Sequence, residues 1–297
     1  MSFFQGCDVK LLRVGPVGQE RPVVLDGAGN LCDIGEREID GAFLDSGGMA
    51  RIRSALEWGD LPVVRPADQA LTPGTDLRIG APVARPGKIV CIGLNYRDHA
   101  EETGAAIPAE PVIFMKAPNT VVGPYDEVLI PRESEKTDWE VELAVVIGRT
   151  ARYVETDEEA LACVAGYAIS NDVSEREFQL ERGGQWDKGK SCETFNPLGP
   201  WLVTPDEAGD PGALGLRLWV NGDLRQDGNT RDQIFPVAEV IRYLSRFMVL
   251  EPGDVINTGT PAGVALGLPG TPYLRAGDVM ELEIDGLGRQ RQTVGQA

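Results

Sequence analysis

The chain has 297 residues, of which 42% are hydrophobic and 25% charged, a balance that is ordinary for a globular protein. Its 28 basic residues stand against 46 acidic ones, so the formal net charge is −18 and no basic stripe is available to neutralise phosphates. Composition therefore argues against nucleic-acid binding. It does not exclude an anionic small molecule, because a site can be locally positive or hold a metal ion.

Five cysteines are scattered along the chain without a CxxC pair, which argues against a disulfide framework or a zinc ribbon. They are Cys7, Cys32, Cys91, Cys163 and Cys192. The N-terminal stretch MSFFQGCDVKLLRV lacks the basic end and the long apolar core of a signal peptide. The sequence contains no run of about 18 apolar residues, so no membrane span is predicted. We therefore expect reduced thiols, a cytoplasmic location and no membrane partner.

Residues 1–74 are expected to form a small, mainly β N-terminal domain. Short apolar pieces at residues 9–14 and 22–25 alternate with glycine-rich turns, and MARIRSALEWG predicts a short helix. The Pro- and Gly-rich segment TPGTDLRIGAPVARPGK is the predicted linker to a second, catalytic domain of residues 75–297.

The second domain is predicted to consist mainly of strands. In chain order, KIVCIGLN, PVIFMKAP, VLIP, WEVELAVVIG and VAGYAISND predict strands, and SEREFQLE looks helical. LRLWVNGDLRQDG predicts a hairpin around Asn221-Gly222, and PVAEVIRYLSRFMVL predicts the clearest helix. EPGDVINTGTP and RAGDVMELEIDGLGRQRQTV each predict a strand after a Gly-Asp turn. The absence of GxGxxG and Walker A motifs disfavours a Rossmann or P-loop fold, and a β-rich α+β fold is expected.

The stretch LNYRDHAEETG contains His99, the single histidine of the chain. It follows a predicted strand and reads as a loop or short helix that ends at Gly104. Glu102 lies three positions after His99, and residues at this spacing share one face of a helical turn. Histidine has the unperturbed pKa of a general base, which a carboxylate can orient. A lone histidine is more often structural, so the catalytic reading depends on a second cluster nearby.

The segment DWEVELAVVIG places Asp138, Glu140 and Glu142 at every second position, so on a strand they share one face. That face continues into apolar residues, and no Lys or Arg alternates with the acids. Burying aligned carboxylates costs several kcal/mol each unless they are compensated, and a divalent cation is the usual compensation. Mg²⁺ or Mn²⁺ suits hard carboxylates, Ca²⁺ is possible, and zinc is disfavoured. The alternative is an edge strand with a solvated acidic rim.

The segments NYRDHAEE, VIFMKAP, WEVELAVVIG, GYAISNDVSEREFQ, GKSCETFNPLGPW and GDVINTGTPAGV follow one another over roughly residues 85 to 290. In this order the chain resembles the fumarylacetoacetate hydrolase family. QLERGGQWDKGKSCETF is most similar to its bacterial sugar-acid branch, which includes 2,4-didehydro-3-deoxy-L-rhamnonate hydrolases and relatives acting on the fuconate analogue. The resemblance implies a fold of rolled, mixed β-sheets with a small N-terminal domain, and a homodimer.

The resemblance also implies roles for individual residues. The implied metal ligands are Glu140, Glu142 and Asp172. The implied catalytic residues are His99, Glu102 and Lys190. The implied substrate-binding residues are Arg176, Gln179, Thr258, Gly259 and Thr260. Four of these residues have a plainer alternative: a helix N-cap for Asp172, a solvated loop lysine for Lys190, and an exposed helix face for Arg176 and Gln179. The glycine-rich loop around Trp186 suits either a rim with one aromatic contact or a plain surface loop.

The implied substrate is a 2,4-dioxo acid whose carboxylate and 2-keto oxygen chelate the metal. Water activated by His99 attacks C4, the C3–C4 bond breaks, and pyruvate leaves with a hydroxy acid such as L-lactate. Lys190 would stabilise the developing oxyanion or enolate. Two positions depart from relatives: Glu193 in place of the common Asp is a conservative change, whereas Asn196 in place of Cys or Gly bears on substrate details but not on the metal. The alternatives are an oxaloacetate decarboxylase or keto–enol tautomerase, and a non-catalytic metal-binding scaffold.

Overall fold

The computed structural model describes residues 9–67 and 77–297. Most of the regular structure is β, in three sheets of twelve, five and two strands within the described residues. The larger sheet contains β1 (Lys10–Val14), β2 (Arg21–Leu25), β3 (Leu31–Asp33), β4 (Val63–Arg65), β5 (Ile79–Gly80), β6 (Ile89–Gly93), β7 (Val112–Lys116), β8 (Val121–Val122), β11 (Val141–Ile147), β12 (Val164–Asn171), β14 (Asn196–Val203) and β17 (Val255–Asn257).

The five-stranded sheet packs beside it and contains β9 (Val128–Ile130), β15 (Gly215–Val220), β16 (Asp223–Asn229), β18 (Val279–Ile284) and β19 (Gly288–Gln296). The two-stranded sheet pairs β10 (Thr137–Asp138) with β13 (Ser174–Glu175). Both parallel and antiparallel pairs occur, as in β17 with β6 and β11 with β12. The predicted β-rich α+β fold of mixed sheets is therefore confirmed.

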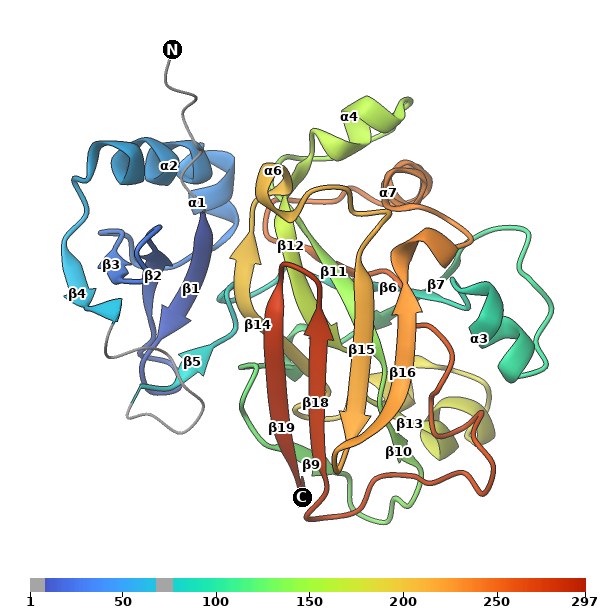
Figure 1. Ribbon diagram of the computed structural model, residues 1–297. Coiled ribbons are helices and arrows are strands. Elements are labelled where there is room, and N and C mark those ends of the chain that lie inside the picture. The colour runs from blue at the N-terminus through green and yellow to red at the C-terminus, as the bar shows by residue number, and fades with distance from the viewer. Residues whose placement is uncertain (1–8, 68–76) are drawn as a thin grey trace.

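The helices are short and lie at the edges of the sheets (Figure 1). They are α1 (Gly41–Asp45), α2 (Gly48–Trp58), α3 (Arg97–Glu102), α4 (Asp157–Leu161), α5 (Asp187–Lys190), α6 (Pro205–Ala208) and α7 (Val237–Leu244). A π-helical turn spans Glu177–Glu181, and 3-10 turns span Pro118–Thr120 and Thr230–Asp232. The predicted SEREFQLE helix is thus a single π turn. None of the described helices is long and apolar enough to cross a membrane.

Strand β11 lies inside the larger sheet, between β12 and β17, with all seven residues buried. Alternate side chains of β11 pack into two different hydrophobic cores, and neither face of the strand is exposed to solvent. Val141 and Leu143 belong to the core shared with the five-stranded sheet, whereas Ala144 and Val146 belong to the core under the N-terminal helices. The alternative of an edge strand with a solvated acidic rim is therefore wrong.

The N-terminal strands extend the larger sheet, because β1 pairs with β14 as well as with β2. In Figure 1 these strands and helices α1 and α2 form a distinct lobe at one side of the molecule. Part of the expected linker is itself a strand, since β5 pairs with the far end of β1. The predicted boundary after residue 74 lies outside the described residues, so the division into two domains stays a prediction.

Candidate active site

A cavity of about 240 Å³ opens where β6, β11, α3, α5 and the π turn meet. Seven of the predicted site residues line it: His99, Glu140, Glu142, Arg176, Gln179, Lys190 and Thr260. The remaining lining residues are mostly apolar. This volume lies just below the roughly 300 Å³ at which pockets for drug-sized ligands begin, so the cavity fits a molecule of a few carbon atoms.

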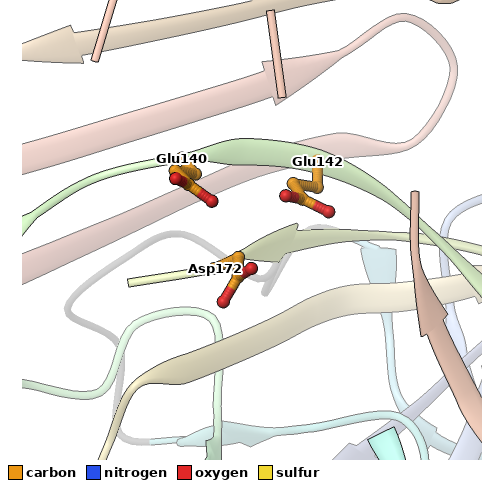
Figure 2. Close-up of side chains that lie close together, drawn as sticks. All are labelled: Glu140, Glu142 and Asp172. Carbon is orange, nitrogen blue, oxygen red and sulfur yellow. The ribbon is translucent and has the colours of Figure 1, made fainter. Parts of the chain in front are cut away.

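Three carboxylates converge on the floor of this cavity from two neighbouring strands. Glu142 lies in β11 and Glu140 directly precedes it, whereas Asp172 directly follows β12, whose Asn171 pairs with Val141. The backbone N–H of Asp172 donates to the Glu140 carbonyl at 2.9 Å, which locks the two segments together. Oxygen atoms of the three carboxylates lie within 4.8 Å of one another, and Figure 2 shows the side chains turned toward a common point.

Buried cations hold two of these carboxylates. Lys190 Nζ donates to Glu140 Oε2 at 2.7 Å and to Asp172 Oδ2 at 2.8 Å. Lys116 Nζ forms a second ion pair with Asp172, and Arg176 Nη2 donates to Glu140 Oε1 at 2.7 Å. Burial by itself raises the pKa of Glu140, but the charges of Lys190 and Arg176 outweigh it and hold the pKa of Glu140 below its usual range.

Glu142 differs because none of the described cations forms an ion pair with it. Its Oε2 accepts one hydrogen bond, from the backbone N–H of Gly259 at 2.7 Å. Burial, followed by repulsion from Asp172 and Glu140, raises the pKa of Glu142 well above its ordinary value. A buried carboxyl group whose ionised form is disfavoured in this way, beside two other carboxylates, is the arrangement that a divalent cation relieves. The oxygen-only donor set suits a hard ion such as Mg²⁺ or Mn²⁺.

His99 lies on α3, with its imidazole on the cavity wall and its side chain nearly buried. Its Nδ1 is 3.7 Å from Glu102 Oε2, and that buried nitrogen makes no hydrogen bond. Glu102 does not line the cavity. Its two carboxylate oxygens both accept from the Gly263 N–H at 3.0 Å, which anchors the C-terminal end of α3. The two side chains are therefore adjacent, but the distance between Nδ1 and Oε2 is about 1 Å longer than that of a hydrogen bond. Catalytic pairs often show such a long separation before substrate binds.

Asp138 does not join the acidic cluster, contrary to the shared face predicted for positions 138, 140 and 142. The strand is interrupted between β10 and β11, so the alternation is not continuous through this point. Asp138 Oδ2 accepts from Arg176 Nε at 2.8 Å, and its Oδ1 accepts from the Ala265 N–H at 2.7 Å. Its role is to position Arg176, whose Nη1 also donates to Gln179 Oε1 at 3.0 Å.

The Thr258-Gly259-Thr260 turn contributes unevenly to the cavity. Thr260 lines it, while its hydroxyl donates to the Val141 carbonyl at 2.9 Å. Gly259 lies behind the wall, with a φ of 95° and so little space that a Cβ would lie 2.7 Å from Asn95 Cβ. Thr258 is also behind the wall, because its hydroxyl donates to the Leu143 carbonyl at 2.9 Å. The turn thus presents one side chain to the cavity and one N–H to Glu142.

Two further residues shape the site without having been singled out from the sequence. Lys116 belongs to the predicted strand VIFMKAP, but nothing in the sequence indicates that it forms an ion pair with Asp172. Asn95 is fully buried and ties the start of α3 to two distant loops: its Nδ2 donates to the Thr258 carbonyl at 2.7 Å, and its Oδ1 accepts from the Phe235 N–H at 2.8 Å. A side chain that bridges backbone segments so far apart carries no local sequence signal.

The fold and the cavity together define a β-rich protein with a buried carboxylate centre suited to a divalent ion. Residues 88–295 match the family described as fumarylacetoacetate (FAA) hydrolase, C-terminal. A Burkholderia cenocepacia protein with the provisional name of hydrolase is 50% identical over 292 residues, which cover 97% of this chain and all of that protein. The chain belongs to the fumarylacetoacetate hydrolase family.

Solved structures agree with this membership. The fumarylacetoacetate hydrolase of Exiguobacterium antarcticum is 35% identical, with a TM-score of 0.79 over 97% of this chain and 100% of that one. The maleylpyruvate hydrolase of a Sphingobium species, solved with manganese(II) and pyruvate, is 30% identical, with a TM-score of 0.76 over 97% of this chain and 99% of that one. The resemblance inferred from the sequence motifs is therefore confirmed at the level of the family.

Proposed function

We propose that this protein is a metal-dependent hydrolase that cleaves the C3–C4 bond of a 2,4-dioxo-3-deoxy sugar acid, such as 2,4-didehydro-3-deoxy-L-rhamnonate. The products are pyruvate and a hydroxy acid such as L-lactate. The single observation that carries this proposal is the convergence of Glu140, Glu142 and Asp172 on one point, with His99 on the wall of the same cavity. The neighbouring maleylpyruvate hydrolase, solved with manganese(II) and pyruvate, supports the metal and the product.

Glu140, Glu142 and Asp172 would hold Mg²⁺ or Mn²⁺. When bound there, the ion would supply a Lewis acid that stabilises negative charge developing on oxygen atoms of the substrate. This explains why three carboxylates are gathered in a buried place that also requires Lys116, Lys190 and Arg176 to balance them.

His99 supplies the base for the attacking water. It removes a proton from the water as the oxygen attacks C4, the C3–C4 bond breaks, and its electron pair stays on C3 as the enolate of pyruvate. The proton then returns to C3, so no redox partner is needed. Glu102, 3.7 Å from Nδ1, favours the imidazolium that forms in between. This assistance is worth about 10²- to 10⁴-fold in rate.

Lys190 and Arg176 are placed to bind substrate oxygens. Lys190 has three N–H donors and uses two of them on Glu140 and Asp172, which leaves one for the substrate. Arg176 has five and uses three, on Asp138, Glu140 and Gln179. Because their partners hold both cations in place, they meet the developing negative charge without reorganising.

Pyruvate release from the synthetic sugar acid, with Mn²⁺ or Mg²⁺ added back to chelator-treated protein, tests the proposal. Oxaloacetate is the comparison substrate, because decarboxylation also gives pyruvate but requires no attacking water. We expect metal-dependent release of pyruvate and L-lactate in equal amounts. Pyruvate from oxaloacetate alone would replace the proposal with a decarboxylase.

A further inference from the structure

The cavity divides into a charged floor and an uncharged rim. The lining residues with charged side chains are all nearly buried, and the two permanent cations among them, Arg176 and Lys190, are 4% and 1% exposed. The lining residues that reach solvent are different in kind. They are Leu94, Thr103, Ala105, Leu180, Trp186 and Leu266. The one hydroxyl among them, that of Thr103, donates to the His99 carbonyl at 2.8 Å.

The two floor cations already face carboxylates of the protein. Arg176 is paired with Asp138 and Glu140, and Lys190 with Glu140 and Asp172. Lys190 keeps one further N–H and Arg176 two, and in the proposed function these donors serve substrate oxygens at the floor. Among the described residues that line the rim, none carries a positive charge. A second carboxylate at the far end of a substrate would therefore lose water and meet no cation among the lining residues.

Trp186 is the largest rim residue, and its neighbours fix its position. Its ring meets Phe114 edge-on, with centroids 5.4 Å apart and planes at 61°. Its other side lies over Gly93, where a Cβ would be 2.6 Å from Trp186 Cζ3. The loop that carries it is fastened to β7, because the Met115 N–H donates to Asp187 Oδ1 at 3.0 Å. The indole is thus a positioned apolar wall, not a free surface ring.

We propose, resting on the function proposed above, that the site selects 2,4-dioxo acids whose far end is uncharged and discriminates against those with a second carboxylate. Trp186 and Leu180 set this selectivity at the rim. A tail ending in a methyl group packs against the indole, and a terminal carboxylate is desolvated there without a partner. The substrate class is therefore a monocarboxylate, as a 6-deoxy sugar acid provides.

The test uses two substrates of equal length, 2,4-dioxoheptanoate and 2,4-dioxoheptanedioate, which differ only in a terminal methyl or carboxylate. Both the dissociation constant of each for the Mn²⁺-loaded protein and kcat/KM for pyruvate release are measured. We expect the wild type to prefer the monoacid by about 100-fold in kcat/KM, with a weaker Kd for the diacid. Equal Kd values and kcat/KM values within about threefold would overturn the inference.

A second test adds a cation at the rim, which should favour the diacid. Leu180→Arg adds a guanidinium at a position that is 44% exposed, so the fold should tolerate it. We expect the preference to narrow by about tenfold, mainly through tighter binding of the diacid. Leu161→Arg is the matched control, because Leu161 is 40% exposed on α4 and does not line the cavity. An unchanged preference in Leu180→Arg, or the same change in Leu161→Arg, would count against a role for the rim.

The tail contact has its own variant. Trp186→Ala should weaken binding of the monoacid by about tenfold and leave binding of pyruvate, which has no tail, unchanged. Equal losses for both ligands would assign Trp186 to the fold instead. If neither dioxo acid releases pyruvate but the difference in Kd persists, the proposed function fails and the selectivity of the site stands, so the two failures are distinguishable.

Discussion

Glu142 is the residue for which the structure predicts the most unusual response, because replacing it with glutamine should stabilise the metal-free protein. Its carboxyl is 2% exposed and has no ion-pair partner among the described residues, and burial together with Asp172 and Glu140 raises its pKa well above 4.5. A group whose pKa is higher in the folded state contributes stability that is fully present below the unfolded-state pKa and is lost as the pH rises.

The size of the effect follows from the same linkage. A carboxyl whose pKa is raised in the folded state holds a proton that the unfolded chain releases above its ordinary pKa of 4.5, and this costs at most about 1.4 kcal/mol for each pH unit. Glutamine does not titrate and therefore carries no such cost, and its carbonyl oxygen can still accept a hydrogen bond from the Gly259 N–H. We therefore expect the unfolding free energy of Glu142→Gln, relative to wild type, to rise between pH 4 and pH 7, with a slope of no more than about 1.4 kcal/mol per pH unit.

The assay is chemical denaturation with chelator and then with Mn²⁺. The wild type should gain about 2.7 kcal/mol at a metal concentration of 100 times Kd, whereas Glu142→Gln should lose most of that gain. Glu57→Gln, which removes an exposed carboxylate on α2, is the matched control and should change neither quantity. A metal-free variant that is less stable at pH 7 than wild type, or one that keeps the full metal response, would refute the reasoning.

Three further predictions concern the same cavity. His99→Asn should lower kcat for pyruvate release by about 10²- to 10⁴-fold with unchanged affinity for Mn²⁺; a loss of metal affinity instead would make the residue structural. Asp138→Ala leaves the buried Arg176 without one partner and should destabilise the protein by about 3–5 kcal/mol in denaturation experiments, so a change under 1 kcal/mol would contradict the pairing. Affinity for Mn²⁺, measured by titration, should rise with pH above 4.5, because Glu142 must lose its proton to bind; a flat profile would argue against its role as a ligand.

The sequence predicted which segments form the site, but not how deeply those segments are buried. The strand around Glu140 and Glu142 was visible from alternation, yet alternation does not distinguish a wet face from a second buried core. Both faces of β11 are buried, because the five-stranded sheet packs on the face of Val141 and the N-terminal lobe covers the face of Ala144. Only the tertiary arrangement decides this point.

The charge pairing around the site could not be predicted. Lys116 and Asp172 are 56 positions apart, and Arg176 reaches back to Asp138 and Glu140 only because β10 pairs with β13. Such contacts depend on strand register, which no local pattern encodes. The helix predicted over PVAEVIRYLSRFMVL is also shorter than its pattern indicates, since it spans Val237–Leu244 and is capped at Ser245.

Isotope labelling of the products tests the central claim of C–C hydrolysis most directly. The sugar acid is converted in H₂¹⁸O with Mn²⁺, and the hydroxy-acid product is analysed by mass spectrometry. Attack of water on C4 predicts a solvent oxygen in the new carboxylate of lactate, released in equal amount with pyruvate. Carbon dioxide in place of lactate, or conversion to an isomer without a solvent oxygen at that carbon, would contradict the account.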